Sequence, residues 1–511
     1  MGFSFSRLPN PEMLPNKLED QRNLDHKFAG GLAWTAGAKW ATQVLTWASL
    51  LAVTRLLSPS DYGVAEMAGI FALVTNVMGE FGIGTAVLHM PELSRKTLAQ
   101  LHSFSCLLCA GIFALATLAT PLVASFFHTE HLLIFIANNT LLLLTGFQAV
   151  PMGLLSRDMD YRRLSLLEAT GVTVQSIVTV IAAFLGWGYW ALFAGNLAGR
   201  LVGTILVCSW KHAGFAWPRW RDIHAPAQLG WQTAIGRTAW ALYSLADGIV
   251  VGRMLGVAVL GNYRIAMNVA SAPAEKVSTL LMRTATPLFA NVKDDHGLVR
   301  RFYLIMVEIL SLIVTPAMVG LAVVAPLAIP VVFGARWNAA SAPVRWLALF
   351  MIVRTMGILT EQVLISQKMT RFTMRMSIVN LAMMPVAFVV GALWQGMTGV
   401  AAAWLYLSPL TIVPLLLVLF HTIHLPYRSY LAALIPAITG SAGMCLALLA
   451  IRQILPASWP AQITLAVQVA VGAAVYGAIL ILAFRERVLR YVRFLQDLRK
   501  GKTSPVSALT P

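Results

Sequence analysis

The sequence predicts an all-α, polytopic membrane protein with about fourteen transmembrane helices, arranged as two six-helix lobes in parallel repeat plus two extra C-terminal helices. Three observations lead to this class: the composition, the length of the apolar segments and the distribution of Lys and Arg. Of the 511 residues, 58% are hydrophobic and 12% are charged, against about 25% charged residues in soluble domains. A chain this apolar does not fold in water as an ordinary globule.

The apolar segments have the length of bilayer-spanning helices. They are too long and too continuously apolar for the alternating strands of an outer-membrane barrel. In chain order they lie near residues 29–54, 62–88, 100–126, 131–155, 165–186, 189–209, 226–252, 262–288, 302–325, 342–366, 373–394, 397–420, 428–451 and 459–484. They take up most of the chain, so no large soluble domain fits, and binding is expected within the helices.

Most of the 38 Lys and Arg residues fall on one side of these segments, in the tails and in the loops that share the side of the N-terminus. The opposite side carries Arg55, Arg253, Arg264, Arg336, Arg345 and Arg452. Cytoplasmic loops of membrane proteins carry the excess of cations. Both termini are therefore predicted to be cytoplasmic.

The two tails differ in character. Residues 1–28 are polar and contain no apolar core of a cleavable signal peptide, so the first span is expected to act as its own insertion signal. Residues 485–511 begin with arginines interleaved with Leu489, Val492 and Leu495 at helical spacing. This pattern predicts a basic amphipathic helix on anionic lipids, which serves chiefly as an orientation anchor.

Three short sequence echoes, each displaced by about 200 residues, indicate an internal repeat. They pair the runs Arg55–Gly63 with Arg253–Gly261, Leu154–Met159 with Leu364–Met369, and Gly188 and Ala191 with Gly399 and Ala402. The displacement corresponds to six spans, which preserves orientation. The predicted divisions are an N-lobe at 29–225, a C-lobe at 226–425 and two added spans at 426–484. Transporters built from such repeats bind substrate between the lobes and alternate access by rocking.

Six cations fall inside the predicted spans, where lipid does not tolerate a charge without a partner or water. They are Lys39, Arg200, Arg237, Lys276, Arg283 and Arg354. A cation at the centre of a bilayer costs at least about 2.5 to 3.5 kcal/mol. An excess of cations suits an anionic ligand such as a phosphate or pyrophosphate. The alternative is that these residues form structural ion pairs between helices.

Several carboxylates also lie within the spans. Glu80 is followed by Gly82 and Gly84, where a helix could flex, and is a candidate for coupling an ion to motion; Glu66 and Asp247 are further candidates. A packed glycine turn with a satisfied carboxylate is the alternative at Glu80.

Other chemistries are not expected. Cys106 and Cys109 form a C-x-x-C inside a span, where they are interpreted as packing residues on one helix face. The histidines form no metal-ligand cluster, and no cofactor is predicted. Residues 31–39 resemble a phosphate-binding loop only faintly, because Trp40 follows Lys39. The net charge of +17 follows the cytoplasmic loops, so nucleic acid is not expected as a partner.

Six short runs of this sequence are typical of one family of membrane proteins. In the first half they are RLLSPSDYG at Arg55–Gly63, GEFGIGTA at Gly79–Ala86 and LSRDMDYR at Leu155–Arg162. In the second half they are DGIVVGRMLG at Asp247–Gly256, LGNYRIA at Leu260–Ala266 and FGARW at Phe333–Trp337. These runs resemble the bacterial polysaccharide transporter family (Wzx-type oligosaccharide flippases), and the similarity extends over roughly residues 30–420.

The resemblance implies the fold of the multidrug/oligosaccharidyl-lipid/polysaccharide exporter superfamily. It implies a non-enzymatic flippase of the bacterial inner membrane that moves undecaprenyl-pyrophosphate-linked oligosaccharide to the periplasmic leaflet for exopolysaccharide, capsule or O-antigen synthesis. Polysaccharide polymerase or export machinery are candidate partners. In related lipid II flippases, arginines of a central cavity are thought to bind pyrophosphate, and Lys39, Lys276 and Arg283 lie on comparable helices. A multidrug exporter of the same superfamily and a membrane-embedded polymerase or ligase are the second and third hypotheses.

Overall fold

The computed structural model describes residues 42–90, 93–456 and 458–487. Over these ranges the chain is almost entirely helical and contains no strand. The prediction of an all-α membrane protein is therefore confirmed. Lys39, the N-terminal tail and residues 488–511 of the predicted amphipathic tail lie outside the described residues.

Ten helical segments are long and apolar enough to cross a membrane, counted over the described residues. The 53-residue segment Thr370–Thr422 covers the two predicted spans 373–394 and 397–420, and it bends between them at Gln395 and Gly396. Two further helices of 36 residues, α8 (Trp220–Leu255) and α9 (Val257–Val292), are not among the ten. The chain is thus a multi-pass membrane protein, and the count of fourteen spans stays a prediction.

The described residues divide into two compact units. Unit 1 contains the residues up to Leu57 together with Ala68–Leu242, and unit 2 contains Ser58–Met67 together with the residues from Tyr243 onward. The divisions fall inside α2 (Pro59–Glu80) and α8, so each of these helices contributes to both units.

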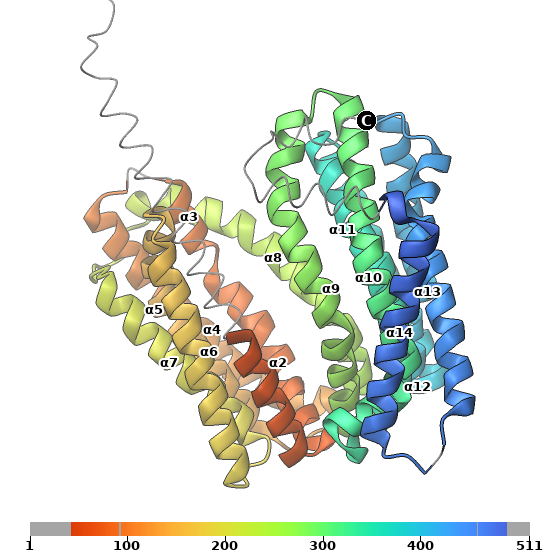
Figure 1. Cartoon of the computed structure of the whole chain (residues 1–511). Coiled ribbons are helices and arrows are strands. Elements are labelled where there is room, and N and C mark those ends of the chain that lie inside the picture. Colours follow the sequence, from red (N-terminus) through yellow and green to blue (C-terminus); the bar gives the residue numbers. More distant parts are fainter. Residues whose placement is uncertain (1–41, 91–92, 457, 488–511) are drawn as a thin grey trace, which may run out of the picture. The chain divides into compact units, whose positions relative to one another are not determined.

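Unit 1 contains a helix over residues 42–56 and most of α2, followed by the helices that carry the remainder of the first half of the chain. These are α3 (Ile83–His89), α4 (Arg95–Phe127), α5 (Leu132–Arg157), α6 (Tyr161–Phe184), α7 (Trp190–Trp210) and the first part of α8. Figure 1 shows α5, α6 and α7 side by side within this unit. Ile83, Leu101, Val150 and Ile223 form one buried apolar cluster from α3, α4, α5 and α8.

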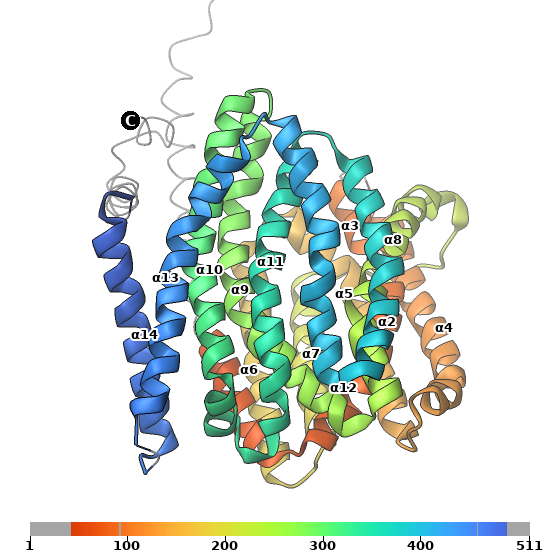
Figure 2. The same cartoon turned by 90° about the vertical axis from the view of Figure 1, so that its right-hand side faces the viewer.

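Unit 2 contains the start of α2, the remainder of α8, and the helices that follow. These are α9, α10 (His296–Phe333), the short 3-10 helix η2 (Ala335–Ala340), α11 (Ser341–Ser366), α12 (Thr370–Thr422), α13 (Tyr427–Ile454) and α14 (Ala461–Ala483). Figure 2 shows α10, α13 and α14 as neighbours. Tyr476 of α14 ties this group together, since its hydroxyl donates to the carbonyl oxygen of Leu312 at 2.7 Å.

The predicted second span is interrupted between α2 and α3. Phe81 and Gly82 both adopt positive φ angles, +43° and +61°, and α3 begins at the next residue. A left-handed conformation is disfavoured for a residue with a Cβ atom, so Phe81 carries local strain while Gly82 does not. The flexible point expected beside Glu80 is therefore an actual break in the helix.

The start of α2 approaches α9 at backbone distance within unit 2. A Cβ atom at Gly63 would lie 1.8 Å from the carbonyl oxygen of Val257, and one at Gly261 would lie 1.9 Å from that of Pro59. Only glycine allows two backbones to come this close. These two residues belong to the runs Arg55–Gly63 and Arg253–Gly261 that form the first sequence echo, so the repeated glycines meet one another.

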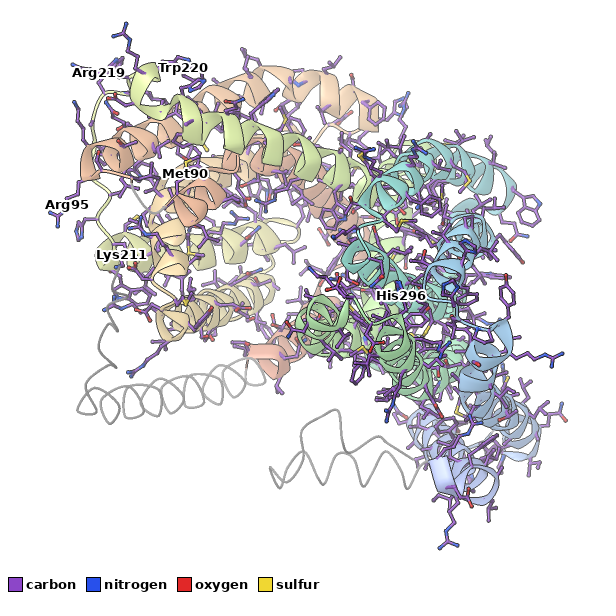
Figure 3. The ribbon with its side chains drawn as sticks, turned by 90° about the horizontal axis from the view of Figure 1, so that it is seen from above. Met90, Arg95, Lys211, Arg219, Trp220 and His296 are labelled. Carbon is purple, nitrogen blue, oxygen red and sulfur yellow. The ribbon has the colours of Figure 1, made fainter. Side chains whose placement is uncertain are left out.

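Several cations predicted on the cytoplasmic side gather at one end of unit 1. Figure 3 shows Arg95, Lys211 and Arg219 at that end. The Nζ of Lys211 forms an ion pair with Asp158 Oδ2 at 2.5 Å. This grouping agrees with the loop assignment from the sequence, whereas the direction of the chain across the membrane stays a prediction.

Candidate functional site

The predicted cations lie on different helices, and those with described side chains differ in their surroundings. Arg200 lies on α7 and Arg237 on α8, both in unit 1. Lys276 and Arg283 lie on α9 and Arg354 on α11, all in unit 2. The side chain of Arg283 lies outside the described part of the chain, as does the whole of Lys39.

Arg237 forms an ion pair with Glu80 at the break after α2. The Nη1 of Arg237 lies 2.5 Å from Glu80 Oε2, and the two side chains are 50% and 41% exposed. Because Glu80 is the last residue of α2, its carboxylate lies directly before the left-handed residues Phe81 and Gly82. The sequence predicts Arg237 as an anion-binding residue and Glu80 as an ion-coupling residue. The structure brings the two side chains together.

The surroundings of the break are packed closely. The carbonyl oxygen of Phe81 would lie 2.2 Å from a Cβ atom at Gly230 of α8, and the Phe81 ring meets Trp231 with ring centroids 5.8 Å apart. The Phe104 ring of α4 lies 5.9 Å away on an edge-to-face geometry. The position of Glu80 is therefore set by aromatic packing and by a close backbone approach from α8.

Arg200 sits among polar side chains of α2, α5 and α7 inside unit 1. Its Nη1 donates to Thr145 Oγ1 at 3.2 Å, and Thr145 Oγ1 in turn donates to Asn76 Oδ1 at 2.8 Å. Gln148 Nε2 donates to Thr204 Oγ1 at 2.6 Å and to the carbonyl oxygen of Arg200 at 3.3 Å. Glu80 is close enough to Arg200 to interact with its charge. The carboxylate of Glu80 therefore pairs with Arg237 and also acts on the charge of Arg200.

Unit 2 contains a cavity of about 710 Å³ between α9 and α11. Its lining includes Glu275, Ser278 and Thr279 of α9 and Arg354 and Thr355 of α11. Arg354 Nη1 lies 3.7 Å from Glu275 Oε1, and the two side chains are 40% and 57% exposed. The sequence places Arg354 in the middle of the tenth span. In the structure its guanidinium and the exposed hydroxyl group of Thr279 lie on a cavity wall that could accept an anion.

Lys276 follows Glu275 on α9 and is exposed. Since it precedes Arg283 by seven residues on one uninterrupted helix, the two positions lie on nearly the same face of α9. That Lys276, Arg283 and Arg354 share one binding surface stays a prediction.

Asp247 and Glu66, the other two ion-coupling candidates, lie in a hydrogen-bonded network of unit 2. Asp247 is 1% exposed, and its Oδ2 accepts hydrogen bonds from the Tyr263 hydroxyl at 2.8 Å and from Trp404 Nε1 at 3.2 Å. Glu66 Oε1 lies 2.7 Å from Arg264 Nε. Both carboxylates are therefore held by partners, and the cation Arg264, assigned from the sequence to the non-cytoplasmic side, is one of those partners.

The sequence did not single out the residues that hold these charged groups. Around Arg200 they are Thr145, which accepts from its guanidinium, Asn76, which accepts from Thr145, and Gln148 and Thr204, which donate to the Arg200 carbonyl oxygen. Around Asp247 they are Tyr263 and Trp404. The one available signal was the occurrence of adjacent polar residues within apolar segments, as in Thr75-Asn76 and Asn138-Asn139-Thr140. Such residues are expensive in lipid and therefore mark helix faces that meet other helices.

The charged and polar side chains within the described ranges are suited to binding an anion. Across the described ranges, no group of three or more His, Cys, Asp or Glu side chains could hold a metal ion. Cys106 and Cys109 are free thiols, and Cys109 is buried against the carbonyl oxygen of Gly79. The arrangement can bind a multivalent anion through guanidinium groups with hydroxyl support.

Comparison with known sequences gives a family match over more than half of the chain. The profile of the family described as "Polysaccharide biosynthesis protein" matches residues 52–342. Lipopolysaccharide biosynthesis protein WzxC of Escherichia coli (strain K12) is 22% identical over 428 residues, covering 78% of this chain and 83% of that protein. Succinoglycan biosynthesis transport protein ExoT of Rhizobium meliloti (strain 1021) is 24% identical over 336 residues, covering 64% and 66%.

Solved structures show which fold the chain shares. A structure described as lipid II flippase MurJ in an inward closed conformation superposes with a TM-score of 0.73 at 14% identity, covering 89% of this chain and 100% of that chain. An inward-facing multidrug resistance MATE family transporter of the MOP superfamily gives a TM-score of 0.56 at 15% identity, covering 75% and 94%. The fold expected from the resemblance is thus confirmed. By the match across residues 52–342, the chain belongs to the polysaccharide biosynthesis protein family.

Proposed function

We propose that this protein is a flippase that moves undecaprenyl-pyrophosphate-linked oligosaccharide from the cytoplasmic to the periplasmic leaflet of the bacterial inner membrane. It works by alternating access, with both termini cytoplasmic, and makes or breaks no covalent bond. Membership of the polysaccharide biosynthesis protein family supports a substrate from that pathway class. The fold that it shares with a lipid II flippase supports a lipid-linked cargo.

The observation that carries the proposal is the position of Arg354. A guanidinium on the wall of an open cavity of about 710 Å³, inside a membrane protein, is suited to a diphosphate that enters from the lipid. Arg200 and Arg237 in unit 1 and Lys39, Lys276 and Arg283 complete the proposed set of pyrophosphate ligands. The exposed hydroxyl group of Thr279, on the same cavity wall, adds a neutral donor beside the charge.

Ion coupling is proposed for the carboxylates Glu80, Glu66 and Asp247. Of the three, Glu80 is the most exposed, with 41% of its side chain accessible. A carboxylate in this position can exchange a proton or a cation with solvent when its arginine partner moves away. Glu66 and Asp247 can respond only if their hydrogen-bonded network opens.

The proposal also includes partners. Anionic lipids are expected at the cationic end of unit 1, which carries Arg95, Lys211 and Arg219 (Figure 3). A polysaccharide polymerase or other export machinery is expected to receive the flipped unit, because a lipid-linked repeat unit is an intermediate and must be consumed on the far side.

The test is a translocation assay in proteoliposomes that contain a defined undecaprenyl-pyrophosphate oligosaccharide and an imposed proton or sodium gradient. Wild-type protein is expected to move the lipid, while Arg354→Ala and Arg237→Ala are expected to insert normally and lose translocation. Arg452→Ala, which removes an exposed cation at the end of α13, serves as the control. Wild-type rates in both Arg354→Ala and Arg237→Ala would refute the assignment of the cations. Absence of translocation by the wild type would refute the function.

A further inference from the structure

We propose that Glu80 and Glu275 are exchangeable counterions, each of which occupies an arginine until the diphosphate of the substrate displaces it. The inference rests on the proposed function. It gives Glu80 and Glu275 a role in the site without substrate, where each carboxylate pairs with an arginine. It follows from one arrangement that occurs twice, once in each unit: an arginine of the proposed binding set paired with a carboxylate from a neighbouring helix.

The two pairs have the same design. In unit 1 the partners come from α8 and α2, with Arg237 Nη1 2.5 Å from Glu80 Oε2. In unit 2 they come from α11 and α9, with Arg354 Nη1 3.7 Å from Glu275 Oε1. In both, each partner keeps between 40% and 57% of its side chain exposed. A ligand can therefore reach the guanidinium without first unpacking the helices.

The ion pair between Glu66 of α2 and Arg264 of α9 behaves differently. Glu66 and Arg264 are only 21% and 26% exposed and lie beside the buried Asp247 network. Breaking this pair would leave two charges enclosed, which costs several kcal/mol. The comparison separates a pair that fixes helices from two pairs that can open.

The physical reason for the counterions lies in the empty state of the carrier. A bare arginine in the interior of a membrane protein is unfavourable, so a carboxylate nearby stabilises the site between transport cycles. An exposed ion pair is weak, because water screens both charges. A diphosphate carries at least two negative charges and several acceptor oxygens that can engage a guanidinium in two hydrogen bonds. It therefore displaces a single carboxylate readily.

The test measures binding of inorganic pyrophosphate to the purified full-length protein in nanodiscs by titration calorimetry, for Glu80→Gln and Glu275→Gln. Each variant removes the competing charge and keeps the shape of the side chain, so pyrophosphate is expected to bind about fivefold more tightly. Asp158→Asn is the matched control, because it makes the same change in net charge by breaking the Lys211 pair at the cationic end of unit 1. Its affinity is expected to stay within about twofold of wild type.

A second arm uses undecaprenyl pyrophosphate in the nanodisc, which separates a lipid-borne diphosphate from a free one. The same gain with both ligands supports the inference. Equal affinities in wild type, Glu80→Gln and Glu275→Gln overturn it, as does an equal gain in Asp158→Asn or a gain confined to the free anion. If the wild type translocates its cargo while the glutamine variants bind pyrophosphate no better, the exchange fails and the flippase function stands. If the wild type neither binds a diphosphate nor translocates, the function itself fails.

Discussion

Arg264 Nε and Glu66 Oε1 lie 2.7 Å apart and join the first turns of α2 to α9 across 198 residues of sequence. The ion pair lies next to the close approach of Gly63 and Gly261, and Tyr62 packs its ring edge-to-face on Trp337 in the same region. An ion pair, a close backbone contact and aromatic packing therefore hold the short segment Ser58–Met67 against the rest of unit 2.

Glu66→Gln is expected to destabilise the protein, because it removes the carboxylate that lies 2.7 Å from the mostly enclosed guanidinium of Arg264. Removing one partner of a fully buried pair costs about 3 to 5 kcal/mol, and the partial exposure here reduces the expectation to about 1 to 3 kcal/mol. Thermal unfolding in detergent measures the loss. The double variant Glu66→Gln with Arg264→Met is expected to recover part of it, since neither member of the pair is left as a charge without its partner. A double variant as unstable as the sum of the two single variants would contradict this account.

Gly63→Ala is expected to destabilise the contact between α2 and α9. Its new methyl group would meet the carbonyl oxygen of Val257 at 1.8 Å, and a backbone atom cannot move aside as a flexible side chain can. Overpacking of this kind costs about 1 to 3 kcal/mol or more. Gly69→Ala, six residues later on the same helix, is the control because a Cβ there meets nothing within 4 Å. It is expected to be neutral or stabilising by up to about 1 kcal/mol. Equal melting temperatures of the two variants would contradict the prediction.

The helices were predictable because each is a long apolar run between polar residues, and the bilayer requires such runs to be helical. Even the bend of α12 at Gln395 and Gly396 falls in the predicted gap between residues 394 and 397. The extent of α8 was not predictable. Its first turns, from Trp220, are polar on one side and pack Ile223 into the core of unit 1, which no count of apolar residues reveals.

The charged residues of the site were predictable, but their pairing was not. Depth in the membrane identified Arg237, Arg354 and Glu80 as unusual, since charges in lipid need a reason. Which carboxylate meets which arginine depends on how helices are packed, and Glu80 precedes Arg237 by more than 150 residues. Tyr263 and Trp404 were missed for a related reason: an aromatic residue in an apolar run gives no sign that its polar atom faces a buried carboxylate.

Tyr263→Phe is expected to destabilise unit 2, because it removes a hydroxyl donor from the buried carboxylate of Asp247. Loss of a hydrogen bond to a charged group costs about 1.5 to 3 kcal/mol. Two donors remain: the backbone N–H of Gly248, 2.7 Å from Oδ1, and Trp404 Nε1, 3.2 Å from Oδ2. The indole ring of Trp404 is held by stacking on Phe350, with ring centroids 4.9 Å apart. The measurement is again thermal unfolding, with Tyr406→Phe as the control because Tyr406 is 58% exposed. A loss no larger than that of the control would show that the network contributes nothing to stability.

Thr145→Val tests whether Arg200 must be held in place to bind its ligand. Valine has nearly the shape of threonine but cannot accept the hydrogen bond from Arg200 Nη1 or donate to Asn76 Oδ1. With its guanidinium released, Arg200 is expected to bind the diphosphate about tenfold more weakly, which corresponds to a lost charge-assisted hydrogen bond of about 1.5 kcal/mol.

The readout for Thr145→Val is the dependence of translocation rate on the concentration of lipid-linked oligosaccharide. A positioning residue raises the concentration needed for half-maximal rate, whereas a merely structural one lowers the amount of folded protein and leaves that concentration unchanged. Thr439→Val is the control, since Thr439 Oγ1 bonds only to carbonyl oxygens of its own helix among the contacts described, at 2.8 Å and 3.3 Å. The same concentration dependence in both variants and in wild type would contradict the prediction. Arg200 would then either need no support from Thr145 or not contact the substrate. Measuring Arg200→Ala in the same assay decides between these two explanations.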